Sequence, residues 1–202
     1  MPKTYLPTFA LTALLACLAT LVPAVQAADE EQKTTEVKAN ALRLQVPEAW
    51  KQERSDSRMR AAQFTIPAKD EKGEAAELVV FYFGGGATGG TEANIERWIG
   101  QFQEKGREVS LSRGEFKQGE YIVADISGTW KKPDGPPFAR KTIDKPNSRV
   151  INVIAIVTDG GEKDHYFLKL AGPDKLVKSQ AEALRKALGA TPDSEKPFKA
   201  EE

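Results

Sequence analysis

The sequence predicts an α+β fold, with a mostly antiparallel sheet and helices packed on it. Several short segments are either wholly apolar or alternate apolar with polar residues, which is the periodicity of strands. Most of them follow one another without a helical segment between them, in the order β-β-β-α-β-β-β-β-α. Consecutive strands with short connections pair antiparallel, because a parallel pair needs a long crossover.

Three strands are expected in the first part of the chain. Residues 42–46 and 61–66 alternate apolar with polar side chains, and a proline that ends the strand follows each segment. Residues 78–83 are apolar on both faces, which is typical of a strand in the middle of a sheet.

Two helices are expected. The first begins at Thr91, a suitable N-cap, and ends near Gly106. The second begins at Pro173 and ends at Gly189. Apolar residues at helical spacing line one face of each segment: Ile95, Trp98, Ile99 and Phe102 in the first, and Val177, Ala181, Leu184 and Leu188 in the second.

Four strands between these helices are expected to form two hairpins. Residues 109–111 and 121–130 are predicted to pair across the turn Gln118-Gly119. Residues 150–157 and 166–170 are predicted to pair across Asp159-Gly160-Gly161, a sequence that favours a tight turn.

These elements place a single domain at residues 41–189. Residues 28–40 are polar, with Val37 as the one large apolar residue, and are expected to be a flexible leader. Residues 190–202 are rich in charge and proline and are expected to be a disordered tail.

The first 27 residues have the order of a secretory signal peptide. Lys3 is followed by an uncharged apolar stretch, and Val25 and Ala27 occupy the small-residue positions before a cleavage site. We therefore expect an exported protein, periplasmic or extracytoplasmic. The alternative is lipoprotein processing at Cys17, which would anchor the chain to a membrane.

Cleavage after Ala27 would also limit the chemistry of the mature chain. It would leave no cysteine, and so no disulfide, thiol nucleophile or thiolate metal site. One of the 29 basic residues, Lys3, would be removed, which leaves 28 against 29 acidic residues. This near balance favours neither nucleic acid nor an anionic membrane surface as a partner, so membrane contact is expected only if Cys17 is lipidated.

A glycine-rich segment is the main candidate for a ligand site. Gly84, Gly85, Gly86, Gly89 and Gly90 lie between a predicted strand and a helix, where backbone amides can bind an anion. The segment matches G-x-G-x-x-G, but a glycine stands where a Walker motif needs its phosphate-binding lysine. We expect no nucleotide and no other cofactor. The alternative is a flexible connector whose glycines adopt positive φ.

No set of catalytic or metal-binding residues stands out. His165 is the one histidine, and its acidic neighbours indicate a polar turn, because a zinc site usually needs several histidines. Asp125, inside an otherwise apolar strand, is expected to be half-buried in a structural hydrogen bond. Catalysis by a pair of carboxylates stays open as an alternative.

Trp130 and Phe138 are candidates for a partner-contacting surface. Trp130 precedes and Phe138 ends the segment that opens residues 131–147. Residues 131–147 contain four prolines and are expected to form a long surface loop. Such a stiffened loop with an aromatic at each end is suited to a partner or a ligand. The alternative is a loop packed over the sheet edge.

The pattern of residues 41–189 resembles the PsbP-like α-β-α sandwich family. The likeness rests on Val46-Pro47 with Trp50-Lys51, the apolar strand, the helix and the final helix after Gly172-Pro173. The strand-GGG…GG segment and Asn94-x-x-Arg97-Trp98-x-x-Gln101-Phe102 are similar to a group of uncharacterised exported bacterial proteins. The resemblance implies a fold and, since characterised PsbP-like domains are mostly accessory or binding proteins, a non-enzymatic role.

Asn94, Arg97 and Gln101 fall on one side of the first helix. They are interpreted either as a polar recognition stripe or as hydrogen-bonding ties to the glycine segment, with the structural role favoured. The leading hypothesis is an exported, non-enzymatic binding or accessory module of the cell envelope, with a protein partner or a small ligand. The alternatives are an exported hydrolase that uses carboxylates and a lipid-anchored structural protein.

Overall fold

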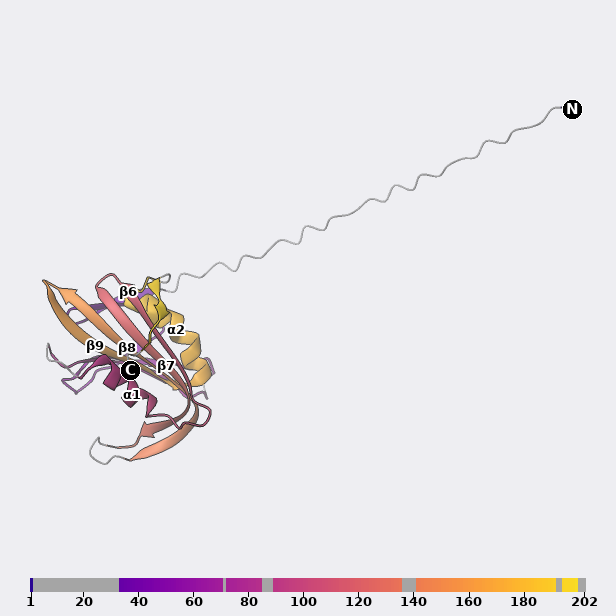
Figure 1. The fold of residues 1–202 in the computed structure, drawn as a ribbon, viewed down its shortest axis with the longest axis horizontal. Helices are drawn as coiled ribbons and strands as arrows, with labels where there is room; N and C mark the ends of the chain where they lie inside the picture. The colour runs from indigo at the N-terminus through magenta and orange to yellow at the C-terminus, as the bar shows by residue number, and fades with distance from the viewer. Residues whose placement is uncertain (2–32, 71, 85–88, 136–140, 192–193, 200–202) are drawn as a thin grey trace. The chain divides into compact units, whose positions relative to one another are not determined.

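The computed structural model describes Met1 and residues 33–70, 72–84, 89–135, 141–191 and 194–199. The chain divides into two units, residues 1–31 and 32–202, and the fold below is that of the second (Figure 1). The predicted signal peptide and Cys17 lie outside the described residues. Within the described part of the chain, no helix has the length and apolar character needed to cross a membrane.

The central feature is an antiparallel sheet, which confirms the predicted fold class. Eight strands of the described residues pair in the order β10-β6-β7-β8-β9-β5-β4-β3, and every neighbouring pair is antiparallel. The strands are β3 (Lys51–Gln52), β4 (Arg60–Ile66), β5 (Ala76–Tyr82), β6 (Glu108–Phe116), β7 (Gly119–Pro133), β8 (Thr142–Asp159), β9 (Glu162–Pro173) and β10 (Lys196–Pro197). The hairpin β8–β9 therefore lies at the centre of the sheet.

The two faces of the sheet are covered by different elements. Helix α2 (Asp174–Leu188) and the hairpin of β1 (Thr34–Ala39) and β2 (Leu42–Pro47) pack on one face, in a core that includes Val123 of β7. Helix α1 (Thr91–Ile99) packs on the other face, in a second core that includes Ala124. Because neighbouring residues of a strand point to opposite faces, the arrangement is an α-β-α sandwich.

The turn glycines and the last helix lie where the sequence places them. Gly160 and Gly161 have φ of 57° and 93° and join Asp159 to Glu162 in a two-residue hairpin. Helix α2 begins at Asp174 after Pro173 and ends at Gly189, whose φ of 77° is the left-handed cap that glycine favours.

Two segments predicted to be flexible or disordered contain strands. Strand β1 lies within the expected leader and pairs with β2, and β10 lies within the expected tail and pairs with β6. Strand β1 pairs with β2 alone, and β10 is a two-residue strand at the edge of the large sheet. Their side chains are mostly exposed, so the sequence shows little apolar pattern there.

Helix α1 is shorter than predicted. Its N-cap is Gly90 instead of Thr91, and it ends at Ile99 with Gly100 as the C-cap, well before Gly106. The reason is that the following backbone pairs with β7: Gln103 N–H donates to the carbonyl of Thr129, and Lys131 N–H donates to that of Gln101. A tertiary pairing thus ends the helix.

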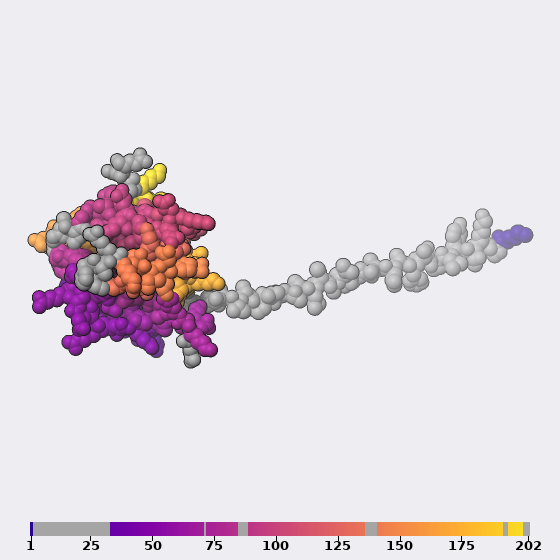
Figure 2. Space-filling model, turned by 90° about the horizontal axis from the view of Figure 1, so that it is seen from below, coloured from indigo at the N-terminus to yellow at the C-terminus, as the bar shows by residue number. Residues whose placement is uncertain are grey.

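The expected long loop at 131–147 is largely an extension of the β7–β8 hairpin. The pairing continues as far as Pro133 opposite Thr142, in the ribbon that curves away from the sheet in Figure 1. Pro146 is accommodated because it sits with Asn147, at φ 53°, in a bulge opposite Thr129. The first residues of β8 lie on the molecular surface, where Ile143 is exposed (Figure 2).

Candidate ligand-binding pocket

A cavity of about 360 Å³ opens between α1 and the sheet. Four aromatic side chains form much of its wall: Phe81, Phe83, Trp98 and Phe167. They come from β5 and its end, from α1 and from β9. The polar side chains at the cavity are Asn94, Arg97, Asn152 and Lys169.

The aromatic rings form a continuous series. The rings of Phe81 and Phe83 are stacked with centroids 6.1 Å apart, and Phe83 meets Phe167 edge-on at 5.8 Å. Trp98 extends the series with an edge-on contact to Phe167, with ring centroids 6.4 Å apart. Phe83 is 45% exposed, so an aromatic ring at the end of the series is open to solvent and to a ligand.

Two polar residues lie side by side at the centre of the sheet. Asn152 of β8 and Lys169 of β9 are direct cross-strand partners. Their outer neighbours in the same row are Ala124 of β7 and Val79 of β5, both apolar. Directly opposed residues have Cβ atoms about 5 Å apart, so the two side chains leave the sheet side by side on the face that α1 covers.

The Asn152 side chain is buried without a partner for its amide nitrogen. The residue is 2% exposed, and Nδ2 has no hydrogen-bond acceptor among the described residues. A buried polar group left unpaired costs about 1–3 kcal/mol. Asn152 also lines the cavity, so this unpaired amide belongs to a residue of the cavity wall.

The Lys169 ammonium is partly buried and has no carboxylate within 4.0 Å among the described residues. Burial lowers its pKa to about 8, with Lys132 of β7 acting in the same direction and Glu77 of β5 opposing. Its Nζ lies 4.6 Å from the centroid of the Trp130 ring, which stabilises the charged form.

Asn94 and Arg97 stand at the α1 side of the cavity. The buried Asn94 donates from Nδ2 to the carbonyl of Gly90 at 2.9 Å, and Arg97 Nη2 donates to Asn94 Oδ1 at 2.6 Å. The favoured interpretation, in which these residues tie the helix to the glycine segment, is confirmed for Asn94. Arg97 is exposed and has no carboxylate within 4.0 Å among the described residues, and it is the second cationic residue that lines the cavity.

The predicted glycine site is described only at its ends. Gly84 and Gly89 have φ of 83° and 86°, conformations that favour glycine, whereas Gly90 has φ of −67°. Gly85 and Gly86 lie outside the described residues. Gly84 follows Phe83 directly, and Asn94 binds Gly90, so both described ends of the segment border the cavity. Whether the segment binds a ligand stays a prediction.

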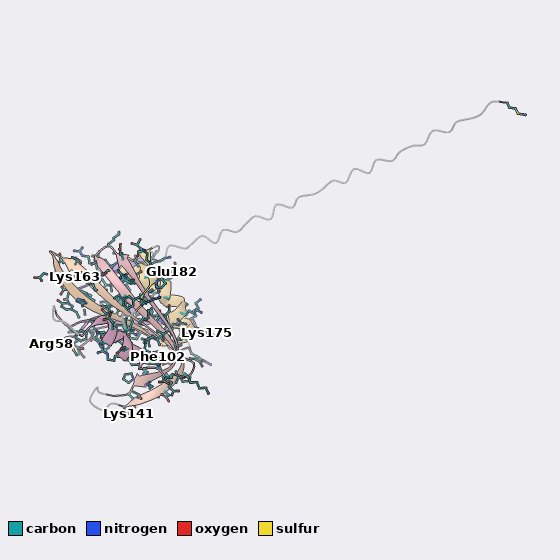
Figure 3. The ribbon with its side chains drawn as sticks, viewed as in Figure 1. Arg58, Phe102, Lys141, Lys163, Lys175 and Glu182 are labelled. Atoms are coloured by element: carbon teal, nitrogen blue, oxygen red, sulfur yellow. The ribbon has the colours of Figure 1, made fainter. Side chains whose placement is uncertain are left out.

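The partner surface predicted at Trp130 and Phe138 is wrong at Trp130. Trp130 is 7% exposed, because the bulge between Gly128 and Trp130 directs its ring onto the core beneath α1, against Lys169. Its backbone bridges to Phe102, labelled in Figure 3. Phe138 lies outside the described residues.

The acid singled out in the sequence belongs to the other face. Asp125 receives two hydrogen bonds from Arg149 Nη1, at 2.8 and 2.9 Å, and Arg149 Nε donates to Asp174 at 2.7 Å. Burial raises the pKa of Asp125, and Arg149 opposes the shift. This ion pair ties β7 and β8 to the start of α2, which is the structural role expected. His165 belongs to no cluster of three or more possible metal ligands among the described residues.

Sequence reasoning missed Asn152 and Lys169, although a signal for them was present. Both are polar residues in predicted strands, 150–157 and 166–170, whose other residues are apolar or aromatic. The predicted turn at Gly160-Gly161 sets the register, and each residue stands eight positions from its turn glycine. Their pairing at the sheet centre follows from that register.

No protein-family model and no curated protein sequence matches the chain. Among solved structures, a similar fold is that of the cyanobacterial PsbP (CyanoP) from Synechocystis sp. PCC 6803. The two chains are 8% identical, and the match covers 85% of this chain and 96% of CyanoP with a TM-score of 0.43. At this distance nothing about function follows from the likeness.

Proposed function

We propose that the protein is an exported, non-enzymatic binding module of the cell envelope whose ligand is a small amphipathic anion. The ligand would combine an apolar, preferably aromatic, body with a carboxylate. The observation that supports this most strongly is the Asn152–Lys169 pair at the floor of an aromatic cavity. Its amide N–H bonds lack an acceptor, and its cation has no carboxylate within 4.0 Å, among the described residues.

The charges that line the cavity favour an anion. Lys169 and Arg97 are cations, Asn152 offers two N–H donors, and none of the described lining residues is an acid. A hydrogen bond to a charged group contributes about 1.5–3 kcal/mol when it is formed away from water. A single carboxylate that reaches both Lys169 and Asn152 would satisfy the buried donors together.

The cavity walls favour an aromatic body. The ring series from Phe81 to Trp98 offers both faces and edges at the usual ring distances. A volume of about 360 Å³ is within the range of small-molecule sites. The pocket is therefore suited to a ligand of one or two rings.

The proposal is tested by isothermal titration calorimetry with three indoles that differ in charge. Indole-3-acetate is expected to bind, indole-3-ethanol to bind at least about tenfold more weakly, and tryptamine not to bind. Equal affinity for all three, or preference for tryptamine, would contradict the proposal.

Variants locate the binding. Lys169→Met and Asn152→Leu are each expected to weaken indole-3-acetate binding about tenfold or more, because each removes a buried donor. Lys163→Met is the matched control on the same strand. Lys163 is 63% exposed and lies at the far end of the β8–β9 hairpin (Figure 3), so its removal is expected to leave affinity unchanged.

Export is the second part of the proposal and rests on the order of residues 1–27. N-terminal sequencing of the protein purified from the periplasm is expected to begin at Ala28. An acylated Cys17 at the N-terminus would instead support the lipid-anchored alternative. An unprocessed chain in the cytoplasm would exclude both.

A further inference from the structure

Lys169 is placed to react as well as to bind. Its side chain lines a cavity of about 360 Å³, its Nζ lies 4.6 Å from the centroid of the Trp130 ring, and Nζ has no carboxylate within 4.0 Å in the described part of the chain. An amine in an apolar setting is a nucleophile toward carbonyl groups, because loss of its proton no longer has to overcome a paired carboxylate.

We propose that the pocket captures aldehydes or 2-oxo acids that carry an anionic group, as a reversible imine on Lys169 Nζ. The inference rests on the proposed function, since it uses the same cavity and the same preference for anions. It adds the chemical class of the ligand and a covalent bond to a named atom.

The reaction needs no oxidant or reductant. The neutral amine attacks the carbonyl carbon, a C–N bond forms, and the carbonyl oxygen takes a proton that leaves the nitrogen. The resulting carbinolamine loses its hydroxyl group with the second amine proton as water, which leaves a C=N bond. Water reverses the sequence.

The neighbours of Lys169 supply the remaining requirements. Asn152, its direct cross-strand partner, has unpaired N–H bonds to donate to the oxygen on which negative charge develops. Arg97, at the α1 side of the same cavity, offers the guanidinium that would hold the ligand's carboxylate. The aromatic series holds the apolar body between these two points.

The protonation state supports the reaction. Burial lowers the pKa of Lys169 to about 8, against the ordinary value of 10.5, with Glu77 opposing and Lys132 assisting. Arg97 on α1 is the further charged group facing the cavity. At pH 8 the fraction of free amine is roughly a hundredfold larger than at an exposed lysine.

The test uses 4-carboxybenzaldehyde with sodium cyanoborohydride at pH 8, followed by intact mass measurement and peptide mapping. Lys169 is expected to be labelled first, at least about tenfold faster than the exposed Lys163 and Lys141, because its free-amine fraction is larger. Asn152→Leu is expected to slow labelling of Lys169 about tenfold. If Lys169 is labelled no faster than the exposed lysines, the proposal is overturned. This comparison is made within the wild-type protein, so it does not depend on whether a variant folds.

A non-covalent isostere separates this proposal from the one it rests on. 4-(Hydroxymethyl)benzoate has the same ring and carboxylate but no carbonyl to attack. If it binds and the aldehyde fails to label Lys169, the covalent proposal fails and the anion site stands. If it does not bind and Lys169 is not labelled preferentially, both fail. Binding together with preferential labelling supports both.

Discussion

Replacement of Lys169 by methionine is expected to stabilise the protein at neutral pH. The change keeps an unbranched side chain, one atom shorter, and removes a cation whose burial destabilises the fold. Burial lowers the Lys169 pKa from 10.5 to about 8, which corresponds to at most about 3 kcal/mol. The side chain is only partly buried, and its contact with the Trp130 ring returns about 0.5–1 kcal/mol. We therefore expect a gain of about 1–2 kcal/mol in the free energy of unfolding.

The pH dependence identifies the cause of this gain. Because the folded pKa of Lys169 is lowered, the cost is full below about pH 8 and falls as the pH rises from there through 10.5. Urea unfolding of wild type and Lys169→Met is therefore expected to differ most at pH 7 and least at pH 10.5. The exposed Lys163→Met is expected to change stability by less than about 0.5 kcal/mol. A loss of stability in Lys169→Met, or a gain that does not change with pH, would refute the reasoning.

Three further predictions concern the Arg185–Glu195 ion pair near the C-terminus, a packed glycine and the pocket. Glu195 accepts two hydrogen bonds from Arg185 at 2.7 Å, which together with bonds from neighbouring hydroxyls lower its pKa to about 2. Glu195→Gln is expected to lose about 2 kcal/mol in urea unfolding at pH 7, discounted because the side chain is 20% exposed. Gly114→Ala is expected to lose about 1–3 kcal/mol, because its Cβ would lie 2.6 Å from the buried Tyr121 ring, and thermal unfolding checks this. Indole-3-acetate affinity is expected to fall above about pH 8 as Lys169 loses its proton, whereas Lys169→Arg keeps its charge and its affinity, as calorimetry at several pH values would show.

Each of these predictions has an outcome that contradicts it. The lowered pKa of Glu195 confers stability above its unfolded value of 4.5 and loses it as the pH falls toward 2, so the Glu195→Gln difference must shrink at pH 3. A difference of equal size at pH 7 and pH 3 would mean that charge is not involved. An unchanged melting temperature in Gly114→Ala would show that Tyr121 can move aside. If the affinity for indole-3-acetate is constant from pH 7 to pH 9, the Lys169 ammonium does not contribute to binding.

Much of the sheet follows from the sequence because its signals are local. The almost wholly apolar segment 150–157, in which Asn152 is the polar residue, and the turn glycines Gly160 and Gly161 predict the central hairpin, and both are confirmed. Proline before α2 and glycine after it set that helix within a residue. Where structure depends on nearby residues, periodicity and turn chemistry are sufficient.

The failures occur where distant backbone decides the outcome. Helix α1 ends early because Gln101 and Gln103 pair with β7, which no local pattern shows. Strands β1 and β10 form by backbone pairing with β2 and β6, and their own sequences show no strand periodicity. Trp130 was expected at the surface because prolines follow it, but the bulge at Pro146 lets the ribbon continue and directs the ring inward.

The candidate site was predictable only in part. Asn94 and Arg97 were singled out by their spacing on the helix, and both line the cavity. Asn152 and Lys169 belong to strands whose apolar character hides two polar residues on one face. Their importance follows from the register of β8 with β9, which brings one unpaired amide and one buried cation together.

Chemical-shift mapping with indole-3-acetate on the ¹⁵N-labelled protein tests the central claim most directly. The side-chain amide of Asn152 reports on the floor of the cavity, because its N–H bonds gain an acceptor when a carboxylate enters. The account predicts a large downfield shift of this NH₂ group, with further changes at Arg97 and Lys169 and none along α2. Changes confined to the α2 face, or an Asn152 amide that does not move at saturating ligand, would contradict an anion site beneath α1.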